Sequence, residues 1–269
     1  MLLACRMRII GSVLGLLLIS TGCVSDPDPV DPPIDCTPEI TTPVTVTGTV
    51  IDFSTKAPVA GATVDLTTAW NGQPGFPGPD ACPILASVET RADGKFGPIT
   101  IDVGSERDEN FVLFLIDGAG RAPTASDNRI CAEASCALDH TIAAPALAVA
   151  DNWRAALGAG GMANADGRGL IAFEFREKDG SAAERVTAEY LADKVMALTP
   201  GTEVRYVDAA RTGLAPASAP STTTSGVALV GPPQDKGSFI GGNRDGIGWQ
   251  LTGCLLEDGW IFLEDRRAP

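Results

Sequence analysis

His140 is the only histidine in the chain. A Ser-His-Asp or Cys-His catalytic arrangement would have to use it, yet the sequence contains no G-x-S-x-G turn of the kind that carries a nucleophilic serine. Zinc sites built on several histidines are excluded for the same reason, and no P-loop motif for binding phosphates is present. We therefore expect no catalytic residue, no metal site and no cofactor.

Carboxylates are the remaining groups that could carry out acid–base chemistry. Asp and Glu together number 34, which is enough to supply a glycosidase-type pair, but no spacing singles one out. The segments 164–167 and 243–246 each resemble part of a calcium loop and lack the later bidentate glutamate. The recurring Asp-Gly pairs are typical of hairpin turns. A carboxylate-dependent hydrolase in the C-terminal half stays an alternative, and a non-enzymatic role is the prediction.

Aromatic side chains in a Gly/Pro-rich stretch, 69–83, are candidates for ligand contact. Trp70 and Phe76 lie there, and aromatic rings on irregular loops can stack on sugar rings or on protein surfaces. The structural alternative is that both rings fold back over a sheet edge. Trp249 and Trp260 are weaker candidates, because both lie in strand-like runs where core packing is the expected role.

The first 22 residues have the pattern of an export signal. Arg6 and Arg8 precede a short apolar run, and small residues lead up to Cys23. The stretch Ile19-Ser-Thr-Gly-Cys23 resembles a bacterial lipobox, which implies cleavage before Cys23 and acylation of that cysteine. Several acyl chains on one residue give a durable anchor. Val24 and Ser25 follow, without an aspartate that would retain a lipoprotein in the inner membrane, so we expect an outer-membrane location.

Residues 23–43 are predicted to form an acidic tether. Prolines and aspartates alternate there, a composition that favours extended chain over packed structure. The net charge of the whole chain is −14, and loss of Arg6 and Arg8 with the signal makes it more negative by two. Nucleic-acid binding needs a basic footprint, so we expect no nucleic-acid partner and membrane contact through the lipid alone.

Five cysteines remain after the signal and the lipidated residue are set aside. In an oxidising compartment such cysteines tend to pair. Cys131 and Cys136 flank a short loop and could pair locally, while Cys36 and Cys82 could tie the tether to the loop 69–83, leaving Cys254 unpaired. Other pairings stay open, because sequence alone cannot choose among them.

The stretch from Val44 to Gly118 has the clearest structural pattern. Apolar and polar residues alternate along 44–50 and again along 62–67, which is typical of half-buried strands. The segment Ser54–Pro58 supplies a tight turn, and Asp93-Gly94 supplies a turn in which positive φ costs little. We predict a small antiparallel sandwich.

A family resemblance rests on short motifs within this stretch: Gly48-Thr-Val50, the turn before Pro58-Val59, Ala60-Gly-Ala-Thr-Val64 and Asp93-Gly-Lys-Phe96. In these motifs residues 46–118 resemble the carboxypeptidase regulatory-like domain, which has a prealbumin-like β-sandwich fold. Members of that family are usually non-catalytic accessory modules. The resemblance implies a sandwich over 44–147 and a binding or structural role.

The rest of the chain is predicted to contain a connector and a second β-rich domain. Residues 121–145 are expected to hold a loop and a last short strand near His140, and 148–168 a helix capped by Asp151 followed by a flexible linker. Within 169–269, strands are expected at 169–177, 202–209, 226–230, 246–253 and 259–265. The order of motifs faintly echoes the first domain, so a diverged tandem copy is one interpretation, and a short helix at 190–200 is another possibility within it.

The fold class predicted from the sequence is therefore all-β, with tandem sandwiches joined by a short helix. The predicted function is that of a lipid-anchored, non-catalytic module at the bacterial outer membrane that binds a polysaccharide or an envelope protein or serves as a structural element. A carbohydrate-binding module using Trp70 and Phe76 is one alternative, and the hydrolase is the other.

Overall fold

The computed structural model describes residues 41–69, 84–104, 110–130, 137–159, 169–191, 203–231, 238–254 and 259–269. They belong to one compact unit, Ile34–Pro269. Strands dominate, and the described part contains a single α-helix. The prediction of an all-β sandwich fold is confirmed.

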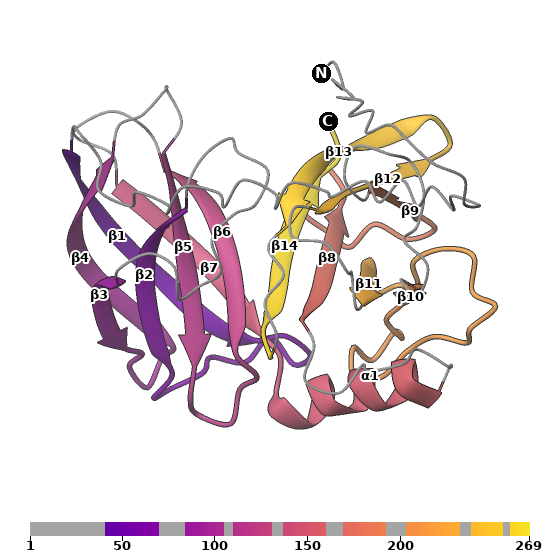
Figure 1. Cartoon of the computed structure of the whole chain (residues 1–269), viewed down its shortest axis with the longest axis horizontal. Helices are drawn as coiled ribbons and strands as arrows, with labels where there is room; N and C mark the ends of the chain where they lie inside the picture. Colours follow the sequence, from indigo (N-terminus) through magenta and orange to yellow (C-terminus); the bar gives the residue numbers. More distant parts are fainter. Residues whose placement is uncertain are drawn as a thin grey trace, which may run out of the picture. The chain divides into compact units, whose positions relative to one another are not determined.

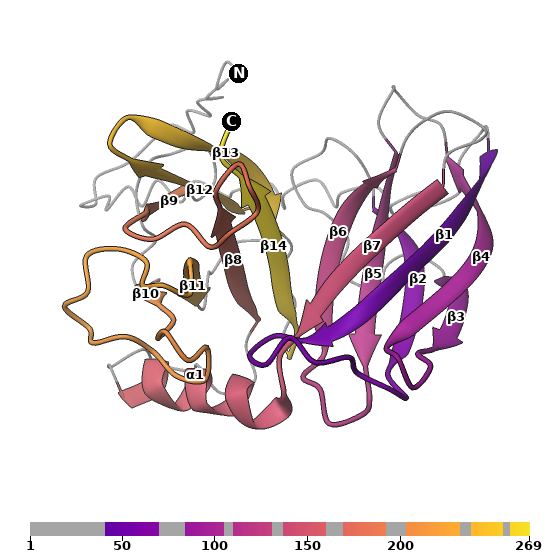
Figure 2. The same ribbon diagram turned by 180° about the vertical axis from the view of Figure 1, so that it is seen from behind.

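The first sandwich is built from the strands that precede the helix. In chain order they are β1 (Thr41–Asp52), β2 (Thr63–Ala69), β3 (Ile84–Glu89), β4 (Lys95–Gly104), β5 (Asn110–Asp117), β6 (Thr124–Ile130) and β7 (Ala137–Ala144). One sheet has the order β4-β1-β7, and the facing strands run β6-β5-β2-β3. Figure 2 shows β1 lying between β4 and β7.

The alternating residues of β1 do what their pattern predicts. Val44, Val46 and Val50 are fully buried and join the core that the two facing sheets share. The threonines between them lie on the opposite, partly exposed face. Because successive side chains of a strand point to opposite faces, one sequence period sets both the core and the solvent face of this sheet.

The second half of the chain forms a second pair of sheets. Its strands are β8 (Leu170–Arg176), β9 (Thr187–Leu191), β10 (Glu203–Tyr206), β11 (Val227–Gly231), β12 (Ser238–Arg244), β13 (Ile247–Cys254) and β14 (Ile261–Arg267). They are arranged as β10-β11-β8-β14 and β13-β12-β9. All five predicted strand runs are present in Figure 1 as β8, β10, β11, β13 and β14.

The strand topology of the second sandwich repeats that of the first. β1 pairs with β4 in antiparallel and with β7 in parallel orientation, and β8 pairs with β11 and β14 in the same two ways. In the facing sheets β5 lies next to β2, as β12 lies next to β9. One strand differs, because β3 pairs with β2 whereas β10 pairs with β11. The second sandwich thus repeats the strand topology of the first, except that its third strand lies in the other sheet.

A buried threonine ties together the first two strands of the first sandwich. The Oγ1 of Thr90 donates to the carbonyl of Val59 at 2.7 Å and accepts the backbone N–H of Ala62 at 2.9 Å. The backbone N–H of Thr90 also donates to Ala62. Four residues later Gly94, at φ +75°, accepts the N–H of Val50. These bonds fix where the chain leaves β1 and enters β2.

Thr222 makes the same set of contacts in the second sandwich. Its Oγ1 donates to the carbonyl of Ala183 at 2.8 Å and accepts the N–H of Val186 at 2.9 Å. Gly226, again four residues later and at φ +70°, accepts the N–H of Phe175. The match extends from topology to individual hydrogen bonds, although the Gly-Ala-x-Val motif of the first copy is absent from the second.

We expect Thr90→Val and Thr222→Val each to lower the free energy of unfolding by about 1–3 kcal/mol, because each leaves a buried N–H and a buried carbonyl without their partner. The two losses should add, since the threonines share no partner. Urea denaturation of both single variants and the double variant measures this. Thr100→Val, on the exposed face of β4, is the control and should change stability little. If Thr222→Val left the free energy of unfolding unchanged, Thr222 would not have the same structural role as Thr90.

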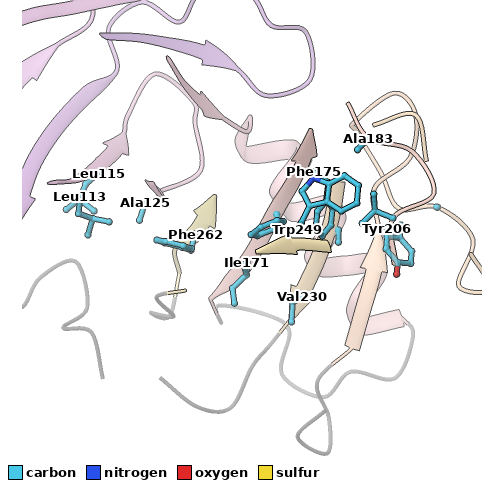
Figure 3. Close-up of a cluster of buried hydrophobic side chains, with 14 residues drawn as sticks. Leu113, Leu115, Ala125, Ile171, Phe175, Ala183, Tyr206, Val230, Trp249 and Phe262 are labelled. Atoms are coloured by element: carbon cyan, nitrogen blue, oxygen red, sulfur yellow. The ribbon is translucent and has the colours of Figure 1, made fainter. Parts of the chain in front are cut away.

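The two sandwiches share one eight-stranded sheet. β14 pairs with β8 over its whole length and with β6 at Ile261↔Thr124 and Phe262↔Ala125. β5 is buried on both faces, with Phe114 in the first core and Leu113 in a cluster that continues into the second sandwich. Figure 3 shows that cluster, from Leu113 to Phe262 and on to Trp249. A continuous apolar cluster and a continuous sheet therefore join the two halves.

Helix α1 (Leu147–Ala159) covers the other face of the second sandwich. Trp153 and Leu157 are fully buried against β8, β11 and β14. The predicted cap at Asp151 is wrong: the helix starts four residues earlier, because the Ala146 carbonyl accepts the first helical N–H groups and Asp151 lies exposed inside the helix. Among the described residues, no helix is long and apolar enough to cross a bilayer.

Candidate functional site

The turn after β1 places a set of charged side chains at the junction of the two sandwiches. Asp52 Oδ1 accepts the N–H groups of Ser54 and Thr55 at 3.0 and 2.7 Å and the Thr55 hydroxyl at 2.9 Å. This side-chain capping is the usual reason for an aspartate at the start of a tight turn. The turn then passes through Lys56 at φ +62°, a left-handed conformation that costs a non-glycine residue about 1–2 kcal/mol.

Asp52 is also held by Arg121 from the loop between β5 and β6, through an ion pair between Oδ2 and Nη1. Burial raises the pKa of Asp52, but the hydrogen bonds from Thr55 and Arg121 outweigh burial, so the pKa lies below its ordinary value. The carboxylate therefore stays ionised at neutral pH, and the turn is fixed to the first sandwich on both sides.

Glu174 is the centre of the junction. It lies in the middle of β8 and is almost fully buried. Its Oε1 accepts from Arg211 Nη2 at 2.6 Å and lies 3.9 Å from Lys56 Nζ, while its Oε2 accepts from Arg176 Nη2 at 3.0 Å. We call Lys56, Glu174, Arg176 and Arg211 the junction network. A buried carboxylate needs such partners, because an isolated buried charge is very costly.

Arg211 connects the network to the turn of the first sandwich. Its backbone carbonyl accepts the hydroxyl of Ser54 at 2.7 Å, and its guanidinium lies 5.2 Å from the centre of the Phe53 ring. Phe53 in turn packs edge-on against Trp153 of α1, with ring centres 5.3 Å apart. Arg211 has φ +61°, so two of the three cations around Glu174 come from strained backbone positions. Strain of this kind persists only where the surroundings fix it.

The electrostatics of the network are unusual at Lys56. Burial lowers its pKa, Glu174 raises it, and Arg211 and Arg176 lower it again, with the result that the pKa falls from the ordinary 10.5 to about 8. The side chain is 38 % exposed, so solvent screens part of this effect. Burial is the largest cause of the lowered pKa of Lys56.

Lys56 should therefore make stability depend on pH. Between pH 8 and 10.5 the unfolded chain keeps a proton on Lys56 that the folded chain has lost, so folding stability rises with pH across this window. We expect the stability of the wild type relative to Lys56→Met to increase from about pH 8 to about pH 10. Urea denaturation at steps of pH measures it. Lys95→Met, at an exposed position, is the comparison variant. A flat profile for Lys56→Met would contradict the assignment.

A second ion pair lies at the far end of β8. Arg244 binds Glu177 with two hydrogen bonds, at 2.5 and 3.0 Å, and its guanidinium lies over the Trp249 ring at 5.3 Å. The bonds from Arg244 lower the pKa of Glu177, and those from Ser181 lower the pKa of Asp179. These shifts run opposite to the raised pKa that a carboxylic general acid needs.

Most residues singled out from the sequence lie outside the described residues. They are Cys23, Cys36, Trp70, Phe76, Cys82, Cys131 and Cys136, together with the segment 164–167. Trp249 is buried in the core and donates its Nε1–H to the Arg176 carbonyl, and Trp260 packs partly buried against the same cluster. Core packing, the structural interpretation given above for these two tryptophans, is what the structure shows.

The second partial calcium motif forms the hairpin between β12 and β13. Asp245 and Gly246 both have positive φ, as the tip of a two-residue hairpin requires. No group of three or more His, Cys, Asp or Glu side chains that could hold a metal ion occurs among the described residues.

The chain was compared with known proteins. No family model matches, and no curated protein matches. Solved structures that resemble it include the Bacillus anthracis TIE protein (9% identity, 85% of this chain and 34% of that chain, TM-score 0.27) and the shaft pilin SpaA of Lactobacillus rhamnosus GG (13%, 85% and 97%, TM-score 0.24). A chlorocatechol 1,2-dioxygenase from Pseudomonas putida matches over 39% of this chain and 60% of its own (12% identity, TM-score 0.28).

The sequence identities and TM-scores of these three likenesses are low. The chain spans 34% of the length of the TIE protein, and all three TM-scores are below 0.3. They are compatible with a β-sandwich and identify no family, so membership of the carboxypeptidase regulatory-like family stays a prediction.

The junction network was not predicted from the sequence. One signal was available: Glu174 interrupts the apolar run of 170–175, and a carboxylate in a strand buried on both faces must find cations. The identity of those cations could not be inferred, because Lys56 and Arg211 reach Glu174 from turns far away in sequence.

Proposed function

We propose that this chain is a non-catalytic module of the bacterial envelope, anchored through Cys23, whose two sandwiches act as one rigid unit. The observation that carries the proposal is the junction: one turn of the first sandwich is fixed to β8, α1 and the Arg211 loop of the second by hydrogen bonds, ion pairs and ring contacts. Domains joined by a small polar interface are expected to move, whereas this junction combines a shared sheet with a shared apolar cluster.

A rigid unit on an acidic tether suits spacing or presentation at a membrane surface. The anchor is tested by replacing Cys23 with serine in the full-length chain. We expect the wild type to incorporate a labelled fatty acid and to fractionate with the outer membrane, and Cys23→Ser to do neither. Labelling that persists in Cys23→Ser would contradict lipid attachment at this residue.

Carbohydrate binding is the second candidate function. The large hydrophobic side chains that are exposed in the described part are aliphatic: Ile84, Leu147 and Ile247. The aromatic side chains proposed here as a platform for sugar rings are Trp70 and Phe76, which lie outside the described residues. Stacking on an aromatic face is a common way to bind neutral sugars.

Glycan-array and pulldown binding of the soluble chain from Ser25 to Pro269 tests this candidate, with a Trp70→Ala/Phe76→Ala double variant as the comparison. Binding by the wild type that is lost in a variant with unchanged thermal stability supports a recognition module with its site on loop 69–83. Binding by neither protein argues for the spacing role alone.

A further inference from the structure

Among the described residues, Lys56 is the one cation of the junction network whose side chain donates no hydrogen bond. Arg211 donates to Glu174 and to the Ser225 carbonyl at 2.7 Å. Arg176 donates to Glu174 and to the Gly180 carbonyl. Within the part of the chain that the structure describes, the Lys56 ammonium donates no hydrogen bond, and its contact with Glu174 is 3.9 Å long. Three N–H groups of this side chain are therefore available.

The charges around Lys56 do not balance. The ion pairs at the junction involve four cations, Lys56, Arg121, Arg176 and Arg211, and three carboxylates, Asp52, Glu174 and Asp265. Arg121 is matched by Asp52, and Asp265 Oδ2 forms an ion pair with Arg176 Nε at 2.9 Å. Glu174 alone then faces the remaining charges. Counted over the described residues of these ion pairs, the surplus is one positive charge, in a protein whose net charge is −14.

The ammonium is also held in place and open to solvent. Lys56 lies over the Phe53 ring at 5.2 Å, and the turn that carries it is fixed by Asp52. Its side chain is 38 % exposed, against 11 % for Arg211. A ligand can therefore reach Lys56 directly, while Arg211 contributes positive potential from behind.

From these observations we propose that Lys56 is the contact residue of a carboxylate-binding site at the junction, with Arg211 and Arg176 supplying the positive field. One monovalent carboxylate balances the surplus charge and accepts the free ammonium N–H groups in a charge-assisted hydrogen bond. Burial is the largest cause of the lowered pKa of Lys56, and Arg211 and Arg176 lower the pKa further, so a bound anion would raise it.

The carboxylate could belong to an acidic sugar of a polysaccharide or to the C-terminus of a peptide. Both present the same group to Lys56. The site would give the proposed envelope module a specific ligand. Only the source of that ligand depends on the proposed function. Its existence is independent of rigidity and of Trp70 and Phe76, so its failure would leave those tests unaffected.

Lysine-specific NMR tests the site in the mature chain. Reductive methylation with a ¹³C label keeps each lysine charged and gives one resonance per side chain, and Lys56→Arg assigns the resonance of Lys56. The probes are sodium glucuronate and N-acetylglycine, with glucose and sodium chloride at matched concentration and ionic strength as controls. Lys95, exposed on β4, is the internal reference.

We expect a saturable shift of the Lys56 resonance with a carboxylate probe, a rise in its apparent pKa on saturation, and no saturable shift at Lys95. Response to glucuronate alone identifies an acidic sugar, and response to N-acetylglycine alone identifies a peptide C-terminus; either result supports the site. The proposal is overturned if Lys56 and Lys95 respond alike, or if chloride reproduces the shift, since both results indicate general screening.

Discussion

Glu174→Gln is expected to lower the free energy of unfolding by about 3–5 kcal/mol, the usual cost of removing one partner from a buried ion pair. The substitution keeps the shape of the side chain and removes its charge. Arg211 and Arg176 would then lose the anion that each binds, at 2.6 and 3.0 Å. Urea or guanidinium denaturation measures the loss.

Two comparisons make this result specific. Glu177→Gln removes the partner of Arg244 at a more exposed pair and should cost much less, as solvent-exposed pairs do. The double variant Glu174→Gln/Arg211→Gln should be less destabilised than the sum of its single variants, because the two side chains interact directly. Equal costs at Glu174 and Glu177 would show that the junction network is not a stabilising centre.

Gly94→Ala and Gly226→Ala should destabilise the protein by similar and large amounts. Each glycine has positive φ, which costs alanine about 1–2 kcal/mol. An added Cβ would also lie 2.6 Å from the Val50 carbonyl oxygen in the first copy and 2.8 Å from that of Phe175 in the second. Backbone oxygens held in sheets cannot move aside easily, so overpacking adds to the cost.

Gly246→Ala is the matched control, because Gly246 has φ +84° and no atom within 4 Å of an added Cβ. It should show the conformational cost alone. Thermal unfolding of the three variants separates the two contributions. If Gly246→Ala lowered stability as much as the other two substitutions, the short distances from the added Cβ to the carbonyl oxygens at Gly94 and Gly226 would not contribute to the loss of stability.

The sequence predicted those parts of the fold in which a local pattern decides the structure. Alternation marked β1, and the apolar runs marked β8 and β11. It missed β6, whose residues Ala-Ser-Asp-Asn are poor strand formers; β6 is a strand because it pairs with β5 along its length. It also missed β12, where Gly241 and Gly242 interrupt the pattern and pairing on both edges, with β13 and β9, compensates.

The second sandwich could not be recognised as a repeat of the first from the Gly-Ala-x-Val motif. The motif around Ala60–Val64 marks the first sandwich, yet its counterpart in the second, Ala183–Val186, keeps the hydrogen bonds and not the residue types. Arg185, at φ +59°, accepts the left-handed conformation that Gly61 has at φ +71°. Hydrogen bonds to the backbone do not depend on the side chain, so the copy could diverge in sequence while the path of the chain was kept.

The candidate site was harder to foresee than the fold. Glu174 was visible as a charge in an apolar run, but its partners come from the β1–β2 turn and from the loop after β10, which no local pattern brings together. Contacts of this kind form only when the two sandwiches pack against each other. That the two sandwiches form one rigid unit is the central claim about this protein.

TROSY-detected ¹⁵N relaxation of the soluble chain from Ser25 to Pro269 tests the claim most directly. Amides in β2 and β5 report on the first sandwich, and amides in β11 and β12 report on the second. A rigid junction predicts a single rotational correlation time for both sets, appropriate to the mass of the whole chain. Two shorter and different correlation times would show that the sandwiches tumble separately and would contradict the rigid unit proposed here.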